Sequence, residues 1–377
     1  MRVLHSGSLN VKSGGPALSV YLSVKGLEAC GAEVAMVTAP KLEGDKLIAD
    51  DVELHFTEPI RNERLGYMPG LRRLLAGLGE YDLYHVQGLW QYLGHGVASF
   101  ARSLGCPYVL TLRGMLYPQA LAHSKWVKKL SLALYQRRDL QRAACIQATC
   151  FEEMAHYRHL GFTNPVAVLP NPIEVGGIVE RVIPAKSVVR VGYLGRVHPR
   201  KRIEKLIYAF HHLGALVENV ELVVIGSGDE VYERFLREEV RRLKLRNVRF
   251  TGFLSGGEKD EAITQLSLLC VPSDFENFGN IVSEALIRGV PVIASKGMPW
   301  KDLEDYHCGW WIDNSQESID RTLAEALSTS VEERVKMGMN GKRLMIEKYS
   351  VEVLGRKMQQ LYDWILNGGE KPEFVYT

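Results

Sequence analysis

The stretch from Leu268 to Ala285 reads LLCVPSDFENFGNIVSEA and combines three structural signals in one short segment. The run Leu268–Val271 is apolar and ends at Pro272, which is typical of a strand buried on both faces. A polar loop follows, and we expect a helix to begin after Gly279. A buried strand that leads through a loop into a helix is the repeating unit of parallel α/β sheets.

The same alternation continues along almost the whole chain. Parallel strands need crossover connections, so the pattern predicts an α/β fold with two doubly wound, Rossmann-like sheets. In the first half we expect strands at 3–4, 34–37, 52–56, 83–86, 108–112 and 166–169, with helices at 16–30 and 94–104. In the second half we expect strands at 188–194, 220–225, 248–250, 268–271, 290–294 and 310–312, with helices at 202–213, 230–243, 259–266 and 281–288.

The alternation breaks at residues 170–187, where three prolines and two glycines disfavour a regular element. We therefore predict a first domain at 1–172, a linker at 173–186 and a second domain at 187–349. Strands are expected to stop after Gly309, and helices to dominate from about 316 to 366. The tail, about 350–377, is expected to cross back onto the first domain. Two such sheets would face each other across a cleft, with ligands outside the carboxyl ends of their strands.

Composition excludes several classes of protein. The 377 residues are 46% hydrophobic and 24% charged, which suits globular packing rather than disorder. The formal net charge of +2 argues against a nucleic-acid-coating protein, so no nucleic-acid partner is expected. No apolar run is long enough to cross a bilayer, and the N-terminus has no secretory signal pattern, so we expect a cytoplasmic protein. The six cysteines lack metal-site spacing and read as reduced, mostly buried thiols, with no metal site.

The strongest candidate site lies in the loop and helix after Val271. Glu276 falls in the loop, and Glu284 falls about one turn into the helix, four residues after Asn280. The amides at Gly279–Ile281 would lie at the helix N-terminus, which favours a phosphate. A carboxylate accepts two hydrogen bonds at once, which suits the vicinal diol of a sugar. Two carboxylates flanking anion-binding amides match the order hydroxyl, phosphate, hydroxyl of a nucleotide sugar.

Two further loops carry candidate anion-binding groups. Arg196 and Lys201 stand five residues apart after the strand that ends at Leu194, where they could neutralise a diphosphate. A solvated basic turn is the alternative interpretation. Gly14 and Gly15 precede a helix with Pro16 at its start, so they form either an anion site or simply a turn. Neither loop has the P-loop or G-x-G-x-x-G pattern.

Together these motifs resemble the retaining glycosyltransferases of family 4, the glycosyl transferase group 1 proteins, which have the two-domain GT-B fold. Glu276 and Glu284 are similar to the family's E-x7-E pattern, and Gly195-Arg196 with Lys201 is similar to its G-R-x4-K loop. The resemblance covers nearly the full length. It implies that Glu284 holds the ribose, Glu276 contacts the donor sugar, and Arg196 and Lys201 neutralise the diphosphate. It further implies phosphate or sugar binding at Phe278, Gly279, Asn280 and Ile281, phosphate contact at Gly14 and Gly15, and a base pocket near Gly226, Gly252, Phe253 and Leu254.

Arg113 departs from the family pattern, because many members have a histidine at this place. Arginine stays protonated and cannot act as a general base. We expect Arg113 to hydrogen-bond the transferred sugar or the acceptor. His85 is either a residue of the acceptor site or a core histidine. Residues 124–142 form a basic amphipathic helix that either rests on anionic lipid or packs on the sheet.

The resemblance therefore implies a retaining, metal-independent hexosyltransferase that uses a UDP- or GDP-sugar as co-substrate and needs no other cofactor. A glycan or a lipid-linked molecule is the expected acceptor, in bacterial cell-surface polysaccharide synthesis, with peripheral contact at the cytoplasmic face of the inner membrane. The alternatives are a nucleotide-sugar epimerase of similar architecture and a non-catalytic two-domain sugar-binding protein.

Overall fold

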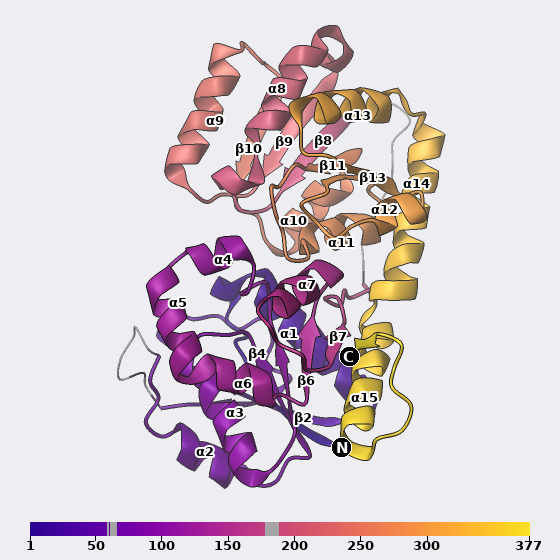
Figure 1. Ribbon diagram of the computed structural model, residues 1–377. Helices are drawn as coiled ribbons and strands as arrows, with labels where there is room; N and C mark the ends of the chain where they lie inside the picture. Colours follow the sequence, from indigo (N-terminus) through magenta and orange to yellow (C-terminus); the bar gives the residue numbers. More distant parts are fainter. Residues whose placement is uncertain (59, 61–65, 178–187) are drawn as a thin grey trace. The chain divides into compact units, whose positions relative to one another are not determined.

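The computed structural model describes residues 1–58, 60, 66–177 and 188–377 (Figure 1). The chain divides into two compact units. Unit 1 comprises Met1–Glu174 and Tyr349–Thr377, and unit 2 comprises Val175–Lys348. Most of the predicted linker 173–186 lies outside the described residues.

Unit 1 is built on an eight-stranded sheet in the order β14-β7-β6-β5-β4-β1-β2-β3. All neighbouring strands are parallel except β14 and β7, which pair antiparallel at one edge. The strands are β1 Arg2–Ser6, β2 Glu33–Thr38, β3 Glu53–Phe56, β4 Leu83–Gln87, β5 Tyr108–Thr111, β6 Cys145–Ala148, β7 Val166–Val168 and β14 Val375–Tyr376. The helices are α1 Gly15–Ala29, α2 Leu71–Gly77, α3 Tyr92–Leu104, α4 Pro118–Ala122, α5 Lys125–Ser131, α6 Arg137–Arg142, α7 Phe151–His159 and α15 Val351–Asn367, with the short turns η1 Val11–Ser13 and η2 Leu132–Gln136.

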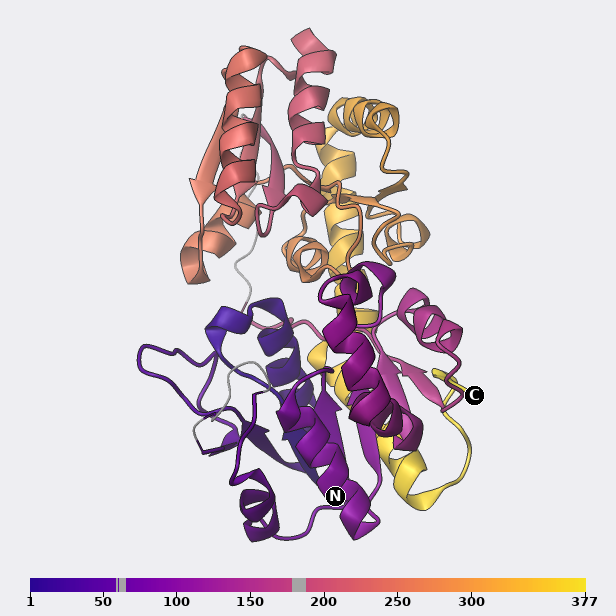
Figure 2. The same cartoon turned by 60° about the vertical axis from the view of Figure 1, so that its left-hand side comes forward.

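Both faces of this sheet are buried because successive side chains of a strand point to opposite sides. Val3 and Val109 pack under α1 and α15, whereas Leu4 and Leu110 pack under α2, α3, α6 and α7. Figures 1 and 2 show helices on each side of the strands. This two-sided burial explains why the strands read as continuous apolar runs rather than as alternating ones.

The C-terminal helix α15 returns to unit 1 and packs against α1. The crossing is close: a Cβ added at Gly355 would lie 2.3 Å from the carbonyl oxygen of Gly26. Met358, Leu361 and Tyr362 then enter the core beside the first strand. The predicted return of the tail to the N-terminal sheet is confirmed.

Unit 2 is built on a six-stranded parallel sheet in the order β10-β9-β8-β11-β12-β13. Its strands are β8 Val189–Leu194, β9 Val220–Ile225, β10 Val248–Gly252, β11 Leu268–Val271, β12 Val292–Ser295 and β13 Gly309–Ile312. Its helices are α8 Glu204–Leu213, α9 Glu230–Arg242, α10 Gly256–Thr264, α11 Asn280–Ile287, α12 Asp302–Asp305, α13 Gln316–Ser328 and α14 Val331–Leu344, with the short turns η3 Pro199–Lys201, η4 Gly214–Val217 and η5 Met345–Tyr349. One apolar core lies between the sheet and α8, α9 and α13.

The predicted class, two Rossmann-like α/β sheets, is confirmed, but two strands, β6 and β14, were not predicted from the sequence. The strand expected at 310–312 is β13, but the expectation that no strand follows it is wrong, because β14 pairs with β7. The strand β6 was also missed, since it is short and contains Gln147, a polar residue that accepts a hydrogen bond from Thr111 inside the core. No cysteine is in a disulfide, and four of the six are buried. Within the described residues no helix has both the length and the apolar character needed to span a membrane.

Candidate active site

The order of strands in unit 2 reverses between β8 and β11, which lie side by side. In open parallel sheets, ligands bind outside the carboxyl ends of the strands at this reversal. The loop after β8 carries Arg196 and Lys201, and the loop after β11 carries Glu276. The fold therefore brings these three charged residues to one edge of the sheet.

Lys201 and Glu276 form an ion pair although they stand far apart in sequence. Both side chains are largely buried, at 11% and 13% exposure. Glu276 Oε1 also accepts a hydrogen bond from Ser273 Oγ at 3.2 Å. Burial, together with the nearby Arg200 and Arg196, lowers the pKa of Lys201 to about 8. The ammonium group is therefore mostly protonated at neutral pH, and Arg196 beside it is exposed.

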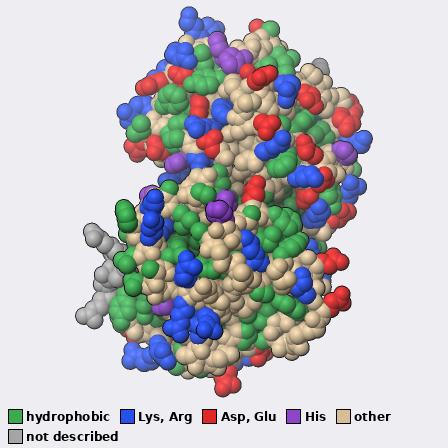
Figure 3. Space-filling model, in the orientation of Figure 1, with side chains coloured by type: hydrophobic (Ala, Val, Ile, Leu, Met, Phe, Trp, Pro, Cys, Tyr) green, Lys and Arg blue, Asp and Glu red, His purple; other side chains and the backbone are tan. Residues whose placement is uncertain are grey.

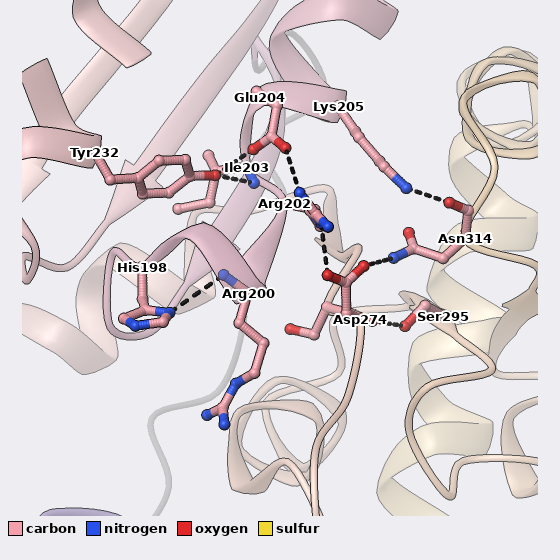
Figure 4. Close-up of polar contacts among 11 residues, drawn as sticks. His198, Arg200, Arg202, Ile203, Glu204, Lys205, Tyr232, Asp274, Ser295 and Asn314 are labelled. Carbon is pink, nitrogen blue, oxygen red and sulfur yellow. Dashed lines mark hydrogen bonds and ion pairs between the residues drawn. The ribbon is translucent and has the colours of Figure 1, made fainter. Parts of the chain in front are cut away.

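A polar network holds the two loops in place (Figure 4). Asp274 Oδ2 accepts from Arg202 Nε at 2.6 Å, and Asp274 Oδ1 accepts from Asn314 Nδ2 at 3.1 Å. The backbone amide of Asp274 also donates to the carbonyl of Arg200 at 2.9 Å. Since Lys201 lies between Arg200 and Arg202, these bonds fix the direction from which it meets Glu276. None of the supporting residues was singled out from the sequence.

Three glycines allow the loops after β8, β9 and β10 to touch. Gly226 has φ 134°, and a Cβ there would lie 2.0 Å from the carbonyl oxygen of Gly195. The Gly226 amide donates to the Gly252 carbonyl at 2.9 Å. Phe253 follows with a side chain that is 71% exposed, and Leu254 is half-buried. The structure thus joins the predicted base-pocket residues to the loop of Arg196.

Helix α11 begins beside the same loops. Gly279 has φ 82°, and no side chain caps the helix there. Ile281 lies near Gly195, and buried Phe278 accepts a hydrogen bond at its carbonyl from Trp300 Nε1 at 2.6 Å. An uncapped helix N-terminus favours an anion through its backbone amides and its dipole. Trp300 is a further residue that was not predicted from the sequence.

Glu284 lies on α11, in the turn after Asn280, as predicted. It forms an ion pair with Lys259 of α10, with Nζ and Oε2 2.5 Å apart. Its side chain is 12% exposed. Lys259 was not recognised from the sequence, because an isolated lysine on a polar helix resembles an ordinary surface residue.

Unit 1 holds the remaining predicted residues at the carboxyl edge of its own sheet. Gly14 and Gly15 lie between β1 and α1, where Gly14 has φ 62° and Pro16 is in the first turn of the helix. Arg113 follows β5 with φ 55°, a conformation that non-glycine residues rarely adopt and that often marks a functional position. Glu153 accepts a hydrogen bond from the Gly114 amide and so holds this turn.

The Arg113 guanidinium is fixed by two neutral side chains. Its Nε and Nη2 donate to Gln87 Oε1 at 3.1 and 2.8 Å, and its Nη1 donates to Asn171 Oδ1 at 2.7 Å. Burial lowers the pKa of Arg113 to about 10, which leaves it cationic at neutral pH. These contacts orient a positive charge without a carboxylate partner within ion-pair distance among the described residues.

His85 is a core residue rather than a lining of an open acceptor site. Its side chain is fully buried, with Nδ1 2.5 Å from Tyr362 Oη and Nε2 2.6 Å from Thr111 Oγ1. Burial holds its pKa well below the usual range, so it stays neutral. Of the two interpretations left open by the sequence, the structure supports the core histidine.

Comparisons with known proteins match both units. A family model described as "Glycosyl transferase 4-like domain" matches residues 14–172, and one described as "Glycosyl transferases group 1" matches residues 183–344. A GDP-mannose-dependent alpha-mannosyltransferase of Mycolicibacterium smegmatis is 28% identical over 163 residues, which are 42% of this chain and 39% of that protein. The chain therefore matches well under two thirds of that relative's length.

Solved structures agree over nearly the whole chain. A sucrose-phosphate synthase from Thermosynechococcus elongatus has a TM-score of 0.76 at 19% identity, covering 98% of this chain and 100% of that one. The Anabaena protein HepE, in complex with UDP and glucose, has a TM-score of 0.70 at 17% identity, covering 96% and 99%. Since the two family models together span most of both units, the chain belongs to the glycosyl transferase group 1 proteins, glycosyltransferase family 4, with the GT-B fold.

Proposed function

We propose that the protein transfers a hexose from a UDP- or GDP-sugar to an acceptor hydroxyl with retention of anomeric configuration. The observation that carries this proposal is the buried Lys201–Glu276 pair at the strand reversal of unit 2, beside the uncapped start of α11. A cation, a carboxylate and a helix N-terminus at one sheet edge suit a ligand that has both hydroxyl groups and a diphosphate.

In this proposal each group has a separate task. Lys201 and exposed Arg196 neutralise the diphosphate, together with the backbone amides at Gly279–Ile281. Glu276 contacts hydroxyls of the sugar, and Glu284 holds the ribose, with its carboxylate oriented by the ion pair to Lys259. The base lies against Gly252, Phe253 and Leu254, where the exposed Phe253 ring offers a flat apolar surface.

The chemistry follows from where charge develops. Cleavage of the anomeric bond leaves positive charge on the sugar and negative charge on the departing diphosphate. Lys201 and Arg196 stabilise the second charge. The sequence places no carboxylate nucleophile opposite the anomeric carbon, so we propose front-face attack in which the leaving phosphate takes the proton of the acceptor hydroxyl. The similar structure in complex with UDP and glucose favours uracil as the base, and the GDP-mannose-dependent relative favours guanine, so the proposal includes both.

Unit 1 contributes the acceptor side. Arg113, held by Gln87 and Asn171, hydrogen-bonds the transferred sugar or the acceptor, and Gly14 and Gly15 approach the phosphates. The acceptor we propose is a glycan or a lipid-linked molecule, used at the cytoplasmic face of a bacterial membrane in the synthesis of cell-surface polysaccharide. Arg113 acts there as a cationic hydrogen-bond donor and carries no proton transfer.

A thermal-shift screen with a panel of UDP- and GDP-sugars tests the donor. A specific donor should raise the melting temperature by mass action, and the shift should disappear in Glu284→Ala, which removes the proposed ribose ligand. Val231→Ser, at an exposed position on α9, is the control and should keep the shift. No shift with any nucleotide sugar would contradict the proposal.

Product analysis then separates transfer from epimerisation. The stabilising donor is incubated alone and with candidate acceptors, and the sugar products are identified. Transfer predicts release of the nucleoside diphosphate and a glycosylated acceptor. An epimerised or eliminated donor, formed without acceptor, would instead favour the epimerase alternative.

A further inference from the structure

The most unusual surface of unit 1 is the long outer helix formed by α5, η2 and α6, residues 125–142. Its inner side is tied to the unit by several hydrogen bonds. Gln136 Oε1 accepts from the Trp90 amide at 2.9 Å, and Tyr135 Oη donates to the Trp90 carbonyl at 3.0 Å. Asp139 pairs with His95 and Arg102, each at 2.8 Å. The helix is therefore anchored, and its outer side is a fixed surface.

The outer side exposes a row of large apolar side chains. Trp126 is 79% exposed, Leu130 59% and Leu134 72%, and Val127 beside them is 64% exposed. Isolated apolar residues are common on protein surfaces, but a contiguous row on one helix marks an interaction site. One of the two sequence-based interpretations was that this helix packs on the sheet. That interpretation accounts for the inner side of the helix but not for the exposed apolar row.

Two arginines extend the same row of side chains. Trp126, Leu130, Leu134, Arg138 and Arg142 recur at every fourth residue, and all five are exposed. In a regular α-helix this spacing drifts by about 40° at each step. The π-helical turn at Leu132–Gln136 contains an extra residue, so each residue there turns the helix by a smaller angle. This offsets part of the rotation, and the five side chains therefore lie on one side of the helix.

Arg138 and Arg142 line a groove of about 610 Å³. Arg102 and Tyr108 form part of its polar wall, and Ile365 and Leu366 at the end of α15 form an apolar wall. No hydrogen bond or ion pair joins the guanidinium group of Arg138 or Arg142 to another residue in the part of the chain that the structure describes. A groove with two unpaired guanidinium groups beside an apolar wall fits a phosphate that is attached to hydrocarbon.

The segment of the chain that contains this helix is rich in basic residues. No aspartate or glutamate occurs between Asp82 and Asp139, whereas this stretch contains seven lysines and arginines. The whole chain is nearly balanced, with 46 basic and 44 acidic residues. Figure 3 shows Lys and Arg side chains gathered on the face of unit 1 that carries α5 and α6. Five of these seven basic residues lie on the helix 125–142, so positive charge exceeds negative charge on the surface with the apolar row.

We propose that this surface docks on an anionic phospholipid bilayer. Trp126, Leu130 and Leu134 enter the interfacial layer, Lys125 and Lys129 meet the surface charge, and the groove of Arg138 and Arg142 takes a lipid phosphate. The biological purpose of this docking rests on the proposed function. If the acceptor is lipid-linked, it lies in the membrane, and a docked enzyme can reach it there. Combined apolar insertion and charge attraction are typical of peripheral membrane helices.

Co-sedimentation with vesicles tests the docking surface. Phosphatidylcholine vesicles with and without phosphatidylglycerol are compared, at low and high salt. We expect binding only to the anionic vesicles, and weaker binding at high salt. Arg138→Glu/Arg142→Glu should weaken it by about twenty-five-fold or more, since each cation contributes about fivefold. Trp126→Ser/Leu130→Ser/Leu134→Ser should weaken it at least about tenfold.

Matched controls come from unit 2. Arg234→Glu/Arg241→Glu on α9 makes the same change in net charge, and Val231→Ser/Met339→Ser removes apolar side chains that are equally exposed. Both controls should bind vesicles like the unmodified protein. Equal losses in the controls, equal binding to neutral vesicles, or no vesicle binding would overturn the proposal. Loss of a dimer in the apolar variant, seen by size-exclusion chromatography without lipid, would assign the surface to a second copy instead and also overturn it.

Measuring donor binding in the same variants distinguishes a failure of the docking proposal from a failure of the proposed function. The docking variants should retain the thermal shift with a nucleotide sugar, because their substitutions lie outside unit 2. Vesicle binding without any nucleotide-sugar shift would leave the docking surface standing and reject the transferase proposal. A nucleotide-sugar shift without vesicle binding would do the reverse.

Discussion

Replacing Lys201 by alanine should remove much of the catalytic rate while leaving donor affinity less affected. Lys201 is the buried cation of the proposed leaving-group site, and its side chain is only 11% exposed. The charge that it meets is largest when the diphosphate departs. An interaction that is stronger in the transition state than in the ground state lowers kcat when it is removed.

The size of the effect follows from burial and charge. With an effective dielectric constant of about 20, a unit charge about 4 Å from a phosphate oxygen contributes about 4 kcal/mol. Removal of one preorganised group of this kind typically costs about a hundredfold to a thousandfold in kcat. Since the pKa of Lys201 is lowered to about 8, roughly nine tenths of the molecules carry the charge at pH 7. We therefore expect Lys201→Ala to lose at least about a hundredfold.

Release of nucleoside diphosphate from the stabilising donor, with water as acceptor, provides an assay that needs no knowledge of the acceptor. Lys205→Ala is the matched control: Lys205 has the same charge and lies four residues away, but it donates to the Asn314 carbonyl instead of meeting Glu276. Glu276→Ala should also lose about a hundredfold. Because the two side chains touch, the losses in the double variant should not add. Near-normal turnover by both single variants would refute the assigned roles.

Three further outcomes are expected. Turnover should fall as pH rises through about 8, because Lys201 then loses its proton, and Lys201→Arg should carry activity to higher pH; a pH–rate profile checks both. Gly355→Ala would place a Cβ 2.3 Å from the Gly26 carbonyl oxygen, so α15 must shift from α1, and urea unfolding should show a loss of about 1–3 kcal/mol. Gly226→Ala would place a Cβ 2.0 Å from the Gly195 carbonyl oxygen at φ 134°, so the thermal shift given by the donor should shrink or vanish while secondary structure by circular dichroism is kept.

Local patterns in the sequence were sufficient to place the charged residues of the candidate site in loops after buried strands. Arg196, Lys201 and Glu276 each follow a buried strand, and the carboxyl ends of parallel strands meet at one edge. Their pairing could not be predicted. The contact between Lys201 and Glu276 exists only because β8 and β11, which are separated by two other strands in the chain, are neighbours in the sheet.

The supporting residues carried no local signal. Lys259 and Trp300 look like ordinary surface or loop residues in sequence, and their partners lie on other elements. His85 shows the opposite error. A histidine at the end of a strand suggested a role in the acceptor site, but its burial between Tyr362 and Thr111 makes it a structural residue. Tyr362 comes from the returning tail, so no reading of the first half could have found this contact.

The sequence by itself determined the alternation of strands and helices, the burial of each strand and the positions of the loop charges, because hydrophobic spacing and turn residues act over a few neighbours. Only the tertiary structure decided which strands are adjacent, which charges pair, and which side of the helix 125–142 stays exposed. Those outcomes depend on contacts between segments far apart in the chain, where burial of apolar surface selects one packing among many that the local pattern allows.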